Sequence, residues 1–184
     1  LVDGFEKTNF VGYDKAETSG KIIGIIDSEA DELCEILAKD KAYFDNSGGG
    51  VTFSGGEPCL QAKFLTELAS ILKARGLHIA LDTSGAVYNG EVDLLLNTVD
   101  LVLLDIKFTD DKAYKLNTGA TLTQVVEFLD RLEEKGKDVW IRHVVVPGIN
   151  DTEEDVLALA NIIKPFGCIK KTELLPFKKL CTEK

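Results

Sequence analysis

A glycine-rich corner, Ser54–Glu57, carries the residues of this chain best suited to chemistry. It follows Val51–Phe53, whose β-branched and aromatic residues predict a short strand, and it precedes apolar residues at helical spacing from Cys59 to Arg75. Two adjacent glycines let a ligand touch the backbone, and Glu57 adds a carboxylate that can bind an ammonium group. The corner therefore predicts a ligand site where a strand ends, as in many α/β proteins. The alternative is a tight turn without a ligand; the glycine spacing fits neither a P-loop nor a dinucleotide fingerprint.

Further polar clusters fall at the ends of three other predicted strands: Asp82–Gly85, Asp105–Lys107 and Arg142. Asp82 and Asp105 could hold a hard cation through their oxygens. Lys107 and Arg142 could bind a carboxylate, so that with Glu57 the clusters suit a ligand bearing an amino-acid zwitterion. Burying such charges costs free energy unless a ligand or a partner charge compensates. For each of these residues the alternative is an internal salt bridge.

The alternation of side chains along a strand sharpens this picture. Asp105 and Lys107 are two residues apart and therefore share one face with Leu103. Arg142 and His143 must face opposite ways, so they cannot both line one cavity. Arg142 is expected to point into the cavity, where it needs a distant carboxylate or an incoming backbone carbonyl. His143 is interpreted as an ordinary strand histidine.

Strands and helices alternate along the chain without a hairpin signal, which predicts right-handed βαβ units around a parallel sheet. The whole chain is expected to form one domain, residues 1–184, in which residues 1–26 show no clear period. Polar clusters after each strand favour a barrel or partial barrel with its site on that face. The predicted strands lie near 51–54, 78–82, 101–107, 139–146 and 172–175, and the predicted helices near 28–42, 59–75, 91–98, 121–136 and from 151 onward.

Composition narrows the class of protein. The net charge of −10 argues against nucleic acid or an anionic membrane as a partner. No apolar run has the length of a membrane span and no signal peptide is visible, so a cytoplasmic protein is expected. The chain has no methionine, even at its first position, and is therefore expected to be a fragment, a trimmed form or a sequence with residues left out. The cysteines are scattered and show no zinc or iron–sulfur spacing: Cys34, Cys59, Cys168 and Cys181.

Five motifs in order, GGGVTFSGGEP, HIALDTSG, DLVLLDIK, WIRHVVVPGIND and ELLP, resemble the activating enzymes of glycyl radical enzymes, above all the pyruvate formate-lyase-activating type. The resemblance runs from about Lys21 to the C-terminus. It implies a radical S-adenosylmethionine oxidoreductase of anaerobic metabolism with a partial (β/α)₆ TIM-like barrel, here lacking part of the first strand. In this family a [4Fe–4S] cluster reduces S-adenosylmethionine, and the resulting radical activates a glycine of the partner enzyme.

The resemblance also implies roles for single residues. Ser54, Gly55, Gly56 and Glu57 would meet the ammonium of S-adenosylmethionine, and Lys107 its carboxylate. Arg142 would lie near the glycyl loop of the partner, and Leu175 near the adenine. The ligands of a monovalent cation beside the carboxylate would be Asp82, Thr83, Asp105 and the carbonyl of Leu103, with Thr83 also contacting the cofactor.

The chain departs from the family where the cluster is bound. The Cys-x₃-Cys-x₂-Cys loop is absent, so this polypeptide is expected to hold no cluster and to be inactive alone. Pro176-Phe177-Lys178 stands where the family usually has Pro-Tyr-His, and the usual C-terminal extension is missing. For the intact protein the resemblance implies a glycyl radical enzyme as partner and a flavodoxin or ferredoxin as electron donor. Two alternatives stay open: a related radical enzyme acting on a small molecule, and a non-catalytic barrel that binds a nucleotide or a partner.

Overall fold

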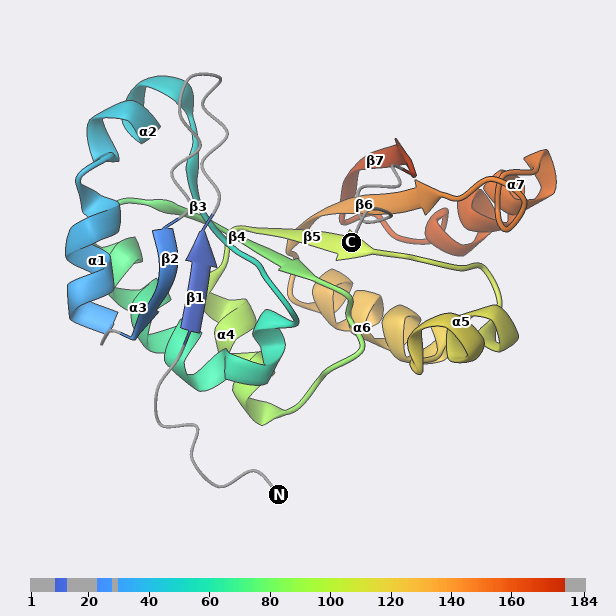
Figure 1. The fold of residues 1–184 in the computed structure, drawn as a ribbon, viewed down its shortest axis with the longest axis horizontal. Helices are drawn as coiled ribbons and strands as arrows, with labels where there is room; N and C mark the ends of the chain where they lie inside the picture. The colour runs from blue at the N-terminus through green and yellow to red at the C-terminus, as the bar shows by residue number, and fades with distance from the viewer. Residues whose placement is uncertain (1–8, 13–22, 28–29, 178–184) are drawn as a thin grey trace, which may run out of the picture. The chain divides into compact units, whose positions relative to one another are not determined.

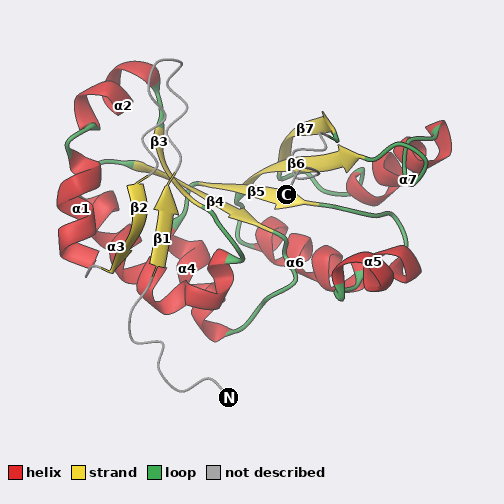
Figure 2. Ribbon diagram, in the orientation of Figure 1, coloured by secondary structure: helices red, strands yellow, loops and turns green. Residues whose placement is uncertain are grey.

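A computed structural model describes residues 9–12, 23–27 and 30–177 of the chain. Figures 1 and 2 show its helices and strands. In chain order they are β1 (Asn9–Gly12), β2 (Ile23–Asp27), α1 (Ala30–Ala38), α2 (Lys41–Ser47), β3 (Gly50–Phe53), the 3₁₀ helix η1 (Pro58–Gln61), α3 (Ala62–Ala74), β4 (His78–Thr83), α4 (Gly90–Thr98), β5 (Leu101–Asp105), α5 (Asp111–Thr118), α6 (Leu122–Glu134), β6 (Asp138–Val145), α7 (Glu153–Ile163) and β7 (Ile169–Pro176).

The main sheet has the strand order β3-β4-β5-β6-β7, as successive βαβ units require. β3 runs parallel to β4, and β6 runs parallel to β7. The predicted α/β class with a parallel sheet is therefore confirmed. The expectation of no hairpin is wrong, because β1 and β2 form a separate antiparallel pair. Both strands lie within residues 1–27, almost all of which belong to the segment without a clear period. Short apolar runs interrupted by glycines left no pattern there that predicts a strand.

The chain divides into two compact units, which are described separately. Unit 1 comprises Leu1–Thr83 and Val87–Val102. In it α3 packs against α1 and α4 (Figure 1), as its apolar stripe requires. Leu65, Leu68 and Leu72 of this stripe are buried. The predicted helix over 59–75 is confirmed, although its first turn is the 3₁₀ helix η1.

Unit 2 comprises Ser84–Ala86 and Leu103–Lys184. Its helix α6 begins with a capping box between Thr121 and Gln124, and its apolar side is buried. The neighbouring helix α5 was not predicted (Figure 1). Only Tyr114 of this short, polar helix is buried, so its sequence has no apolar stripe; its signal is the N-cap Asp110 and the left-handed Gly119 at its end.

Two predicted boundaries need correction. The helix expected over 28–42 is two helices, α1 and α2, and residues 28–29 lie outside the described part. The strand expected over 101–107 ends at Asp105, so Lys107 follows it in a loop. Within the described residues no helix combines the length and the apolar character needed to cross a membrane.

Candidate functional site

The glycine corner keeps its backbone open to a ligand. Gly55 and Gly56 have φ values of 96° and 54°, which non-glycine residues rarely adopt. Both residues are exposed, and a Cβ atom added to Gly56 would meet nothing within 4 Å. The space beside the backbone of Gly56 is therefore open among the described residues.

Ser54 ties the corner to the next strand. Parallel pairing of β3 and β4 places Phe53 opposite Leu81, so Ser54 and Asp82 come next at the carboxyl ends of the two strands. The Ser54 hydroxyl donates a hydrogen bond of 2.9 Å to Oδ2 of Asp82. The structure thus brings together two residues that the sequence assigned to different roles, cofactor binding and cation binding.

Glu57 has a structural role that the sequence analysis missed. Its Oε1 accepts hydrogen bonds from the backbone N–H of Cys59 at 3.1 Å and from the Thr83 hydroxyl at 2.7 Å. The first bond caps η1, and the second links the corner to the end of β4. Burial raises the pKa of the adjacent Cys59 thiol to about 12, so this cysteine is not a thiolate at neutral pH. The signal available in the sequence was a glutamate directly before a helix that starts with proline.

At the end of β5, Leu103 and Asp105 lie on the same face of the strand, as the alternation of side chains predicts. Leu103 and Asp105 are half-buried, whereas Val102 and Leu104 on the other face are fully buried. Asp105 Oδ1 accepts hydrogen bonds from Nε of Arg142 at 3.0 Å and from Nη2 at 2.8 Å. For Asp105 and Arg142 the internal salt bridge is therefore what the structure contains.

Strand order explains this pair. β5 and β6 are neighbours, and the backbone N–H of Ile106 donates to the carbonyl of Arg142 at 3.0 Å. The sequence analysis left a distant carboxylate open as the partner of Arg142 without naming it, and the structure shows that this carboxylate is Asp105. Pairing the two predicted strands in register would have found it.

His143 faces away from Arg142, as alternation predicted. It is fully buried, and its Nδ1 lies 2.6 Å from the carbonyl oxygen of Ile106. Its Nε2 lies 3.2 Å from Nδ2 of Asn150, which is also buried. The sequence analysis did not single out Asn150. Leu175, the residue expected near the adenine, is half-buried in β7 and pairs with Val144 of β6.

The residues predicted to bind metal are divided between the two units. Asp82 and Thr83 belong to unit 1, and Leu103 and Asp105 belong to unit 2. Within the part of the chain that the structure describes, no group of three or more His, Cys, Asp or Glu side chains could hold a metal ion. The three described cysteines are buried, in α1, in η1 and just before β7, and Cys181 lies outside the described residues. These thiols do not fit an iron–sulfur cluster, which needs several thiolates together.

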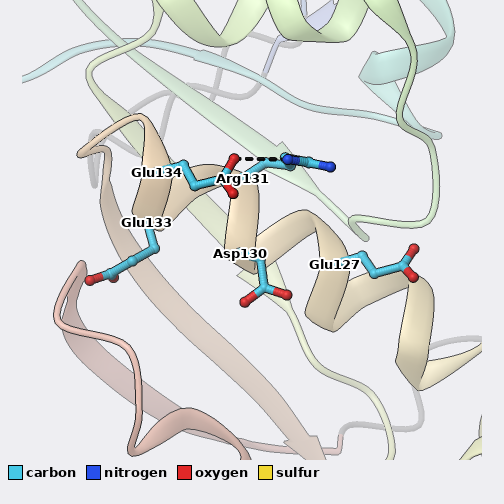
Figure 3. Close-up of a pocket in the computed structure, with 5 residues that line it drawn as sticks. All are labelled: Glu127, Asp130, Arg131, Glu133 and Glu134. Atoms are coloured by element: carbon cyan, nitrogen blue, oxygen red, sulfur yellow. Dashed lines mark hydrogen bonds and ion pairs between the residues drawn. The ribbon is translucent and has the colours of Figure 1, made fainter.

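A pocket on the surface of α6 contains none of the predicted site residues. In Figure 3 its acidic side chains project from the helix in different directions. Glu133 accepts hydrogen bonds from the backbone N–H groups of Gly167 and Cys168, and Glu134 pairs with Arg131. The two bonds of Glu133 connect α6 to the residues just before β7. The lining residues are Glu127, Asp130, Arg131, Glu133 and Glu134.

Comparison with known proteins decides the family. The model of the radical SAM superfamily matches residues 21–160, most of the chain. The chain belongs to the radical SAM superfamily. It is 48% identical over 151 residues to the pyruvate formate-lyase-activating enzyme of Clostridium pasteurianum, covering 82% of this chain and 63% of that protein. It is 44% identical over 161 residues to the enzyme of the same name from Staphylococcus epidermidis, covering 84% and 64%.

Solved structures agree with this assignment of the radical SAM fold. A domain of the pyruvate-formate lyase-activating enzyme from Bacteroides vulgatus matches with a TM-score of 0.65 and 26% identity, over 71% of this chain and 82% of that one. Streptococcus suis SuiB bound to S-adenosylmethionine matches with a TM-score of 0.67 at 17% identity, over 85% of this chain and 35% of that one, and shows the fold alone. The resemblance drawn from the five motifs is thus confirmed. The chain spans less than two thirds of the length of the two activating enzymes above, at 63% and 64%.

Proposed function

We propose that this chain is the S-adenosylmethionine-binding part of an enzyme that activates a glycyl radical enzyme of the pyruvate formate-lyase type. The observation that carries the proposal is 48% identity over 151 residues to a pyruvate formate-lyase-activating enzyme. The open glycine corner supports it, because a radical SAM protein must hold the amino-acid end of its cofactor, and this corner leaves backbone accessible beside a carboxylate.

Different residues bind the two charged groups at the amino-acid end of the cofactor. In the proposal the backbone from Ser54 to Gly56 and the carboxylate of Glu57 bind the ammonium group. Glu57 is held by its bonds to Cys59 and Thr83, so its carboxylate is oriented before the ligand arrives. Lys107 binds the ligand carboxylate. Its side chain makes no hydrogen bond or ion pair with any residue in the described part of the chain, and it is exposed.

Leu175 and the cation ligands complete the proposed binding site. Leu175 packs near the adenine ring of the cofactor. The monovalent cation is bound by Asp82, Thr83, Asp105 and the Leu103 carbonyl. Asp105 has two carboxylate oxygens, and the bonds from Arg142 described above converge on Oδ1. A carboxylate can therefore keep such a bond while its other oxygen binds a cation.

Arg142 is proposed to contact the glycyl loop of the partner enzyme. The guanidinium carries five N–H donors in a fixed plane, of which Nε and Nη2 hold Asp105. Asp105 thereby fixes the orientation of the guanidinium before a partner arrives. An oriented guanidinium can position backbone carbonyls of an incoming loop rather than merely attract them.

The cluster and its electron donor belong to the proposal for the whole protein. Family membership implies a [4Fe–4S] cluster that supplies the electron for cleavage of S-adenosylmethionine. The residues present here do not fit that cluster, because the sequence has no Cys-x₃-Cys-x₂-Cys loop. The same observation favours a second candidate for this polypeptide by itself, a barrel that binds the nucleotide or the partner without catalysis. An electron donor of the flavodoxin or ferredoxin type is required only under the first proposal.

Isothermal titration calorimetry tests the binding site for the cofactor on which both candidate functions depend. S-adenosylmethionine and 5′-methylthioadenosine, which lacks the amino-acid moiety, are titrated into the chain. The proposal predicts tighter binding of S-adenosylmethionine, and a loss of about tenfold in Glu57→Gln confined to that ligand. Glu91→Gln, an exposed glutamate of α4, is the matched control and should bind both ligands like the parent. Equal affinity of the parent for the two ligands would refute the zwitterion site.

A further inference from the structure

The backbone of Lys107 is held at both of its polar atoms by side chains from other elements. Its N–H donates to the hydroxyl oxygen of Tyr114 in α5 at 2.9 Å. Its carbonyl oxygen accepts from Nδ2 of Asn150, which follows β6, at 3.3 Å. Lys107 lies in the loop after β5, where no sheet ladder fixes it. At Lys107, hydrogen bonds from two side chains therefore take the place of backbone pairing with a neighbouring strand.

Tyr114 is suited to hold the loop permanently. The residue is 2% exposed, and its ring makes an edge contact with Phe108, with centroids 5.9 Å apart. Its hydroxyl also donates to the carbonyl of Asp105 at 3.3 Å. Burial raises the pKa of Tyr114 to about 12, so the hydroxyl keeps its proton and both hydrogen bonds at neutral pH.

Asn150 is itself fixed by a buried network. Its Oδ1 accepts from the N–H of Val146 at 2.6 Å, and its Nδ2 lies 3.0 Å from the carbonyl oxygen of Val144. Nδ1 of His143 faces the carbonyl of Ile106, which can only accept, so Nδ1 carries the proton and Nε2 accepts from Asn150. The two N–H groups of the Asn150 amide are thus shared among the Val144 carbonyl, Nε2 of His143 and the Lys107 carbonyl, and His143 helps to hold the amide in this orientation.

The side chain of Lys107 contrasts with this rigid backbone. The guanidinium of Arg142, on the neighbouring strand β6, is bound to Asp105, whereas the Lys107 ammonium has no bond to any described residue. Two side chains hold the backbone of a residue whose charged group is exposed and has no partner among the described residues. Such pre-organisation lowers the entropy lost when a charged group captures a ligand.

We propose that Tyr114 and Asn150, the latter oriented by His143, are positioning residues that set the Lys107 ammonium against the carboxylate of the bound ligand. The inference rests on the proposed function, since it takes S-adenosylmethionine as that ligand. None of the three residues touches the ligand; each acts through the backbone of Lys107. If these residues were purely structural, replacing them would weaken ligand binding by the same factor with or without the Lys107 side chain.

A double-mutant cycle with titrated S-adenosylmethionine separates these roles. Lys107→Ala should weaken binding about tenfold, and Tyr114→Phe and Asn150→Ala about fivefold each. In the Lys107→Ala background, Tyr114→Phe and Asn150→Ala should cause no further loss, because their effect passes through the missing ammonium. Tyr114→Phe keeps the buried ring and guards against the possibility that Asn150→Ala fails to fold. Asn117→Ala, which removes an exposed side-chain bond within α5, is the matched control and should bind like the parent.

A ligand-free measurement makes the outcomes distinguishable. Amide hydrogen exchange at Lys107 should become faster in Tyr114→Phe and unchanged in Asn117→Ala. Losses of affinity that add fully to that of Lys107→Ala overturn the positioning role and leave the proposed function intact. If Lys107→Ala binds like the parent, both the assignment of Lys107 and the positioning role are wrong. If the parent fails to bind S-adenosylmethionine, the proposed function falls and the inference falls with it.

Discussion

The ion pair between Asp105 and Arg142 should contribute measurably to folding. Its side chains are 25% and 22% exposed, and both guanidinium contacts, 3.0 and 2.8 Å, converge on one oxygen. Exposed pairs contribute about 0.2–1 kcal/mol, and hydrogen bonds to charged groups that are shielded from water contribute about 1.5–3 kcal/mol. A half-buried pair with two contacts lies between these ranges. We expect a coupling free energy of about 1–2 kcal/mol.

The assay is urea unfolding of the parent, Asp105→Asn, Arg142→Gln and the double variant. Both single variants should lower the free energy of unfolding, and the double variant should lose less than the sum of the two, because each single variant leaves a charged partner behind. Lys41–Asp45 in α2, with side chains 40% and 56% exposed, is the control pair. Its coupling should be about 0.3–0.5 kcal/mol.

Salt adds a second criterion to the same experiment. One molar sodium chloride should nearly abolish the coupling of the exposed control pair and reduce that of Asp105 and Arg142 less. Coupling no larger than that of the control pair would refute the reasoning. Asp105 would then be held only loosely by Arg142, and the guanidinium would not be oriented before a partner arrives.

Three further predictions concern single residues. In a thermal melt, Gly85→Ala should lower the free energy of unfolding by about 1–3 kcal/mol, because φ at this position is +69° and the new Cβ would lie 2.7 Å from Cδ1 of the buried Leu104. Gly90→Ala is the control and should leave the melt unchanged, because its new Cβ meets nothing within 4 Å. Cys59 should resist alkylation at pH 8 in the folded chain and react only in urea, since burial raises its pKa to about 12; rapid modification, read by mass spectrometry, would contradict this. Burial opposes ionisation of Asp100, but hydrogen bonds from Lys73 and the Ile79 N–H outweigh it and lower the pKa below 3.8. Its stabilising effect should therefore be full above about pH 5 and fade as the pH falls through the lowered pKa, so the difference from Asp100→Asn in urea unfolding should shrink there; a pH-independent difference would be inconsistent with the bonds seen.

The parallel sheet and the glycine corner were predictable because their signals are local. Apolar runs bounded by turns predict strands, and the two consecutive glycines after Ser54 permit backbone angles that other residues rarely adopt. The opposite orientation of Arg142 and His143 followed from strand alternation alone, and the burial of His143 confirms it.

What escaped prediction depends on contacts between distant segments or on elements with weak periodicity. Asp105 and Arg142 are 37 positions apart, and their pairing depends on strand order and register. Helix α5 has one buried residue, Tyr114, so no apolar period indicates it, yet that residue holds Lys107. The second bond of Glu57, accepted from the Thr83 hydroxyl, could be predicted only by knowing that Thr83 ends the strand beside the corner.

Chemical-shift mapping of the isotope-labelled chain tests the central claim most directly. Addition of S-adenosylmethionine should shift the backbone amides of Gly55, Gly56 and Lys107, because the amino-acid end of the ligand is assigned to these residues. The analogue 5′-methylthioadenosine, without that end, should leave Lys107 unshifted. Shifts confined to the acidic pocket of α6, or no shift at any of the three amides with saturating ligand, would contradict the account.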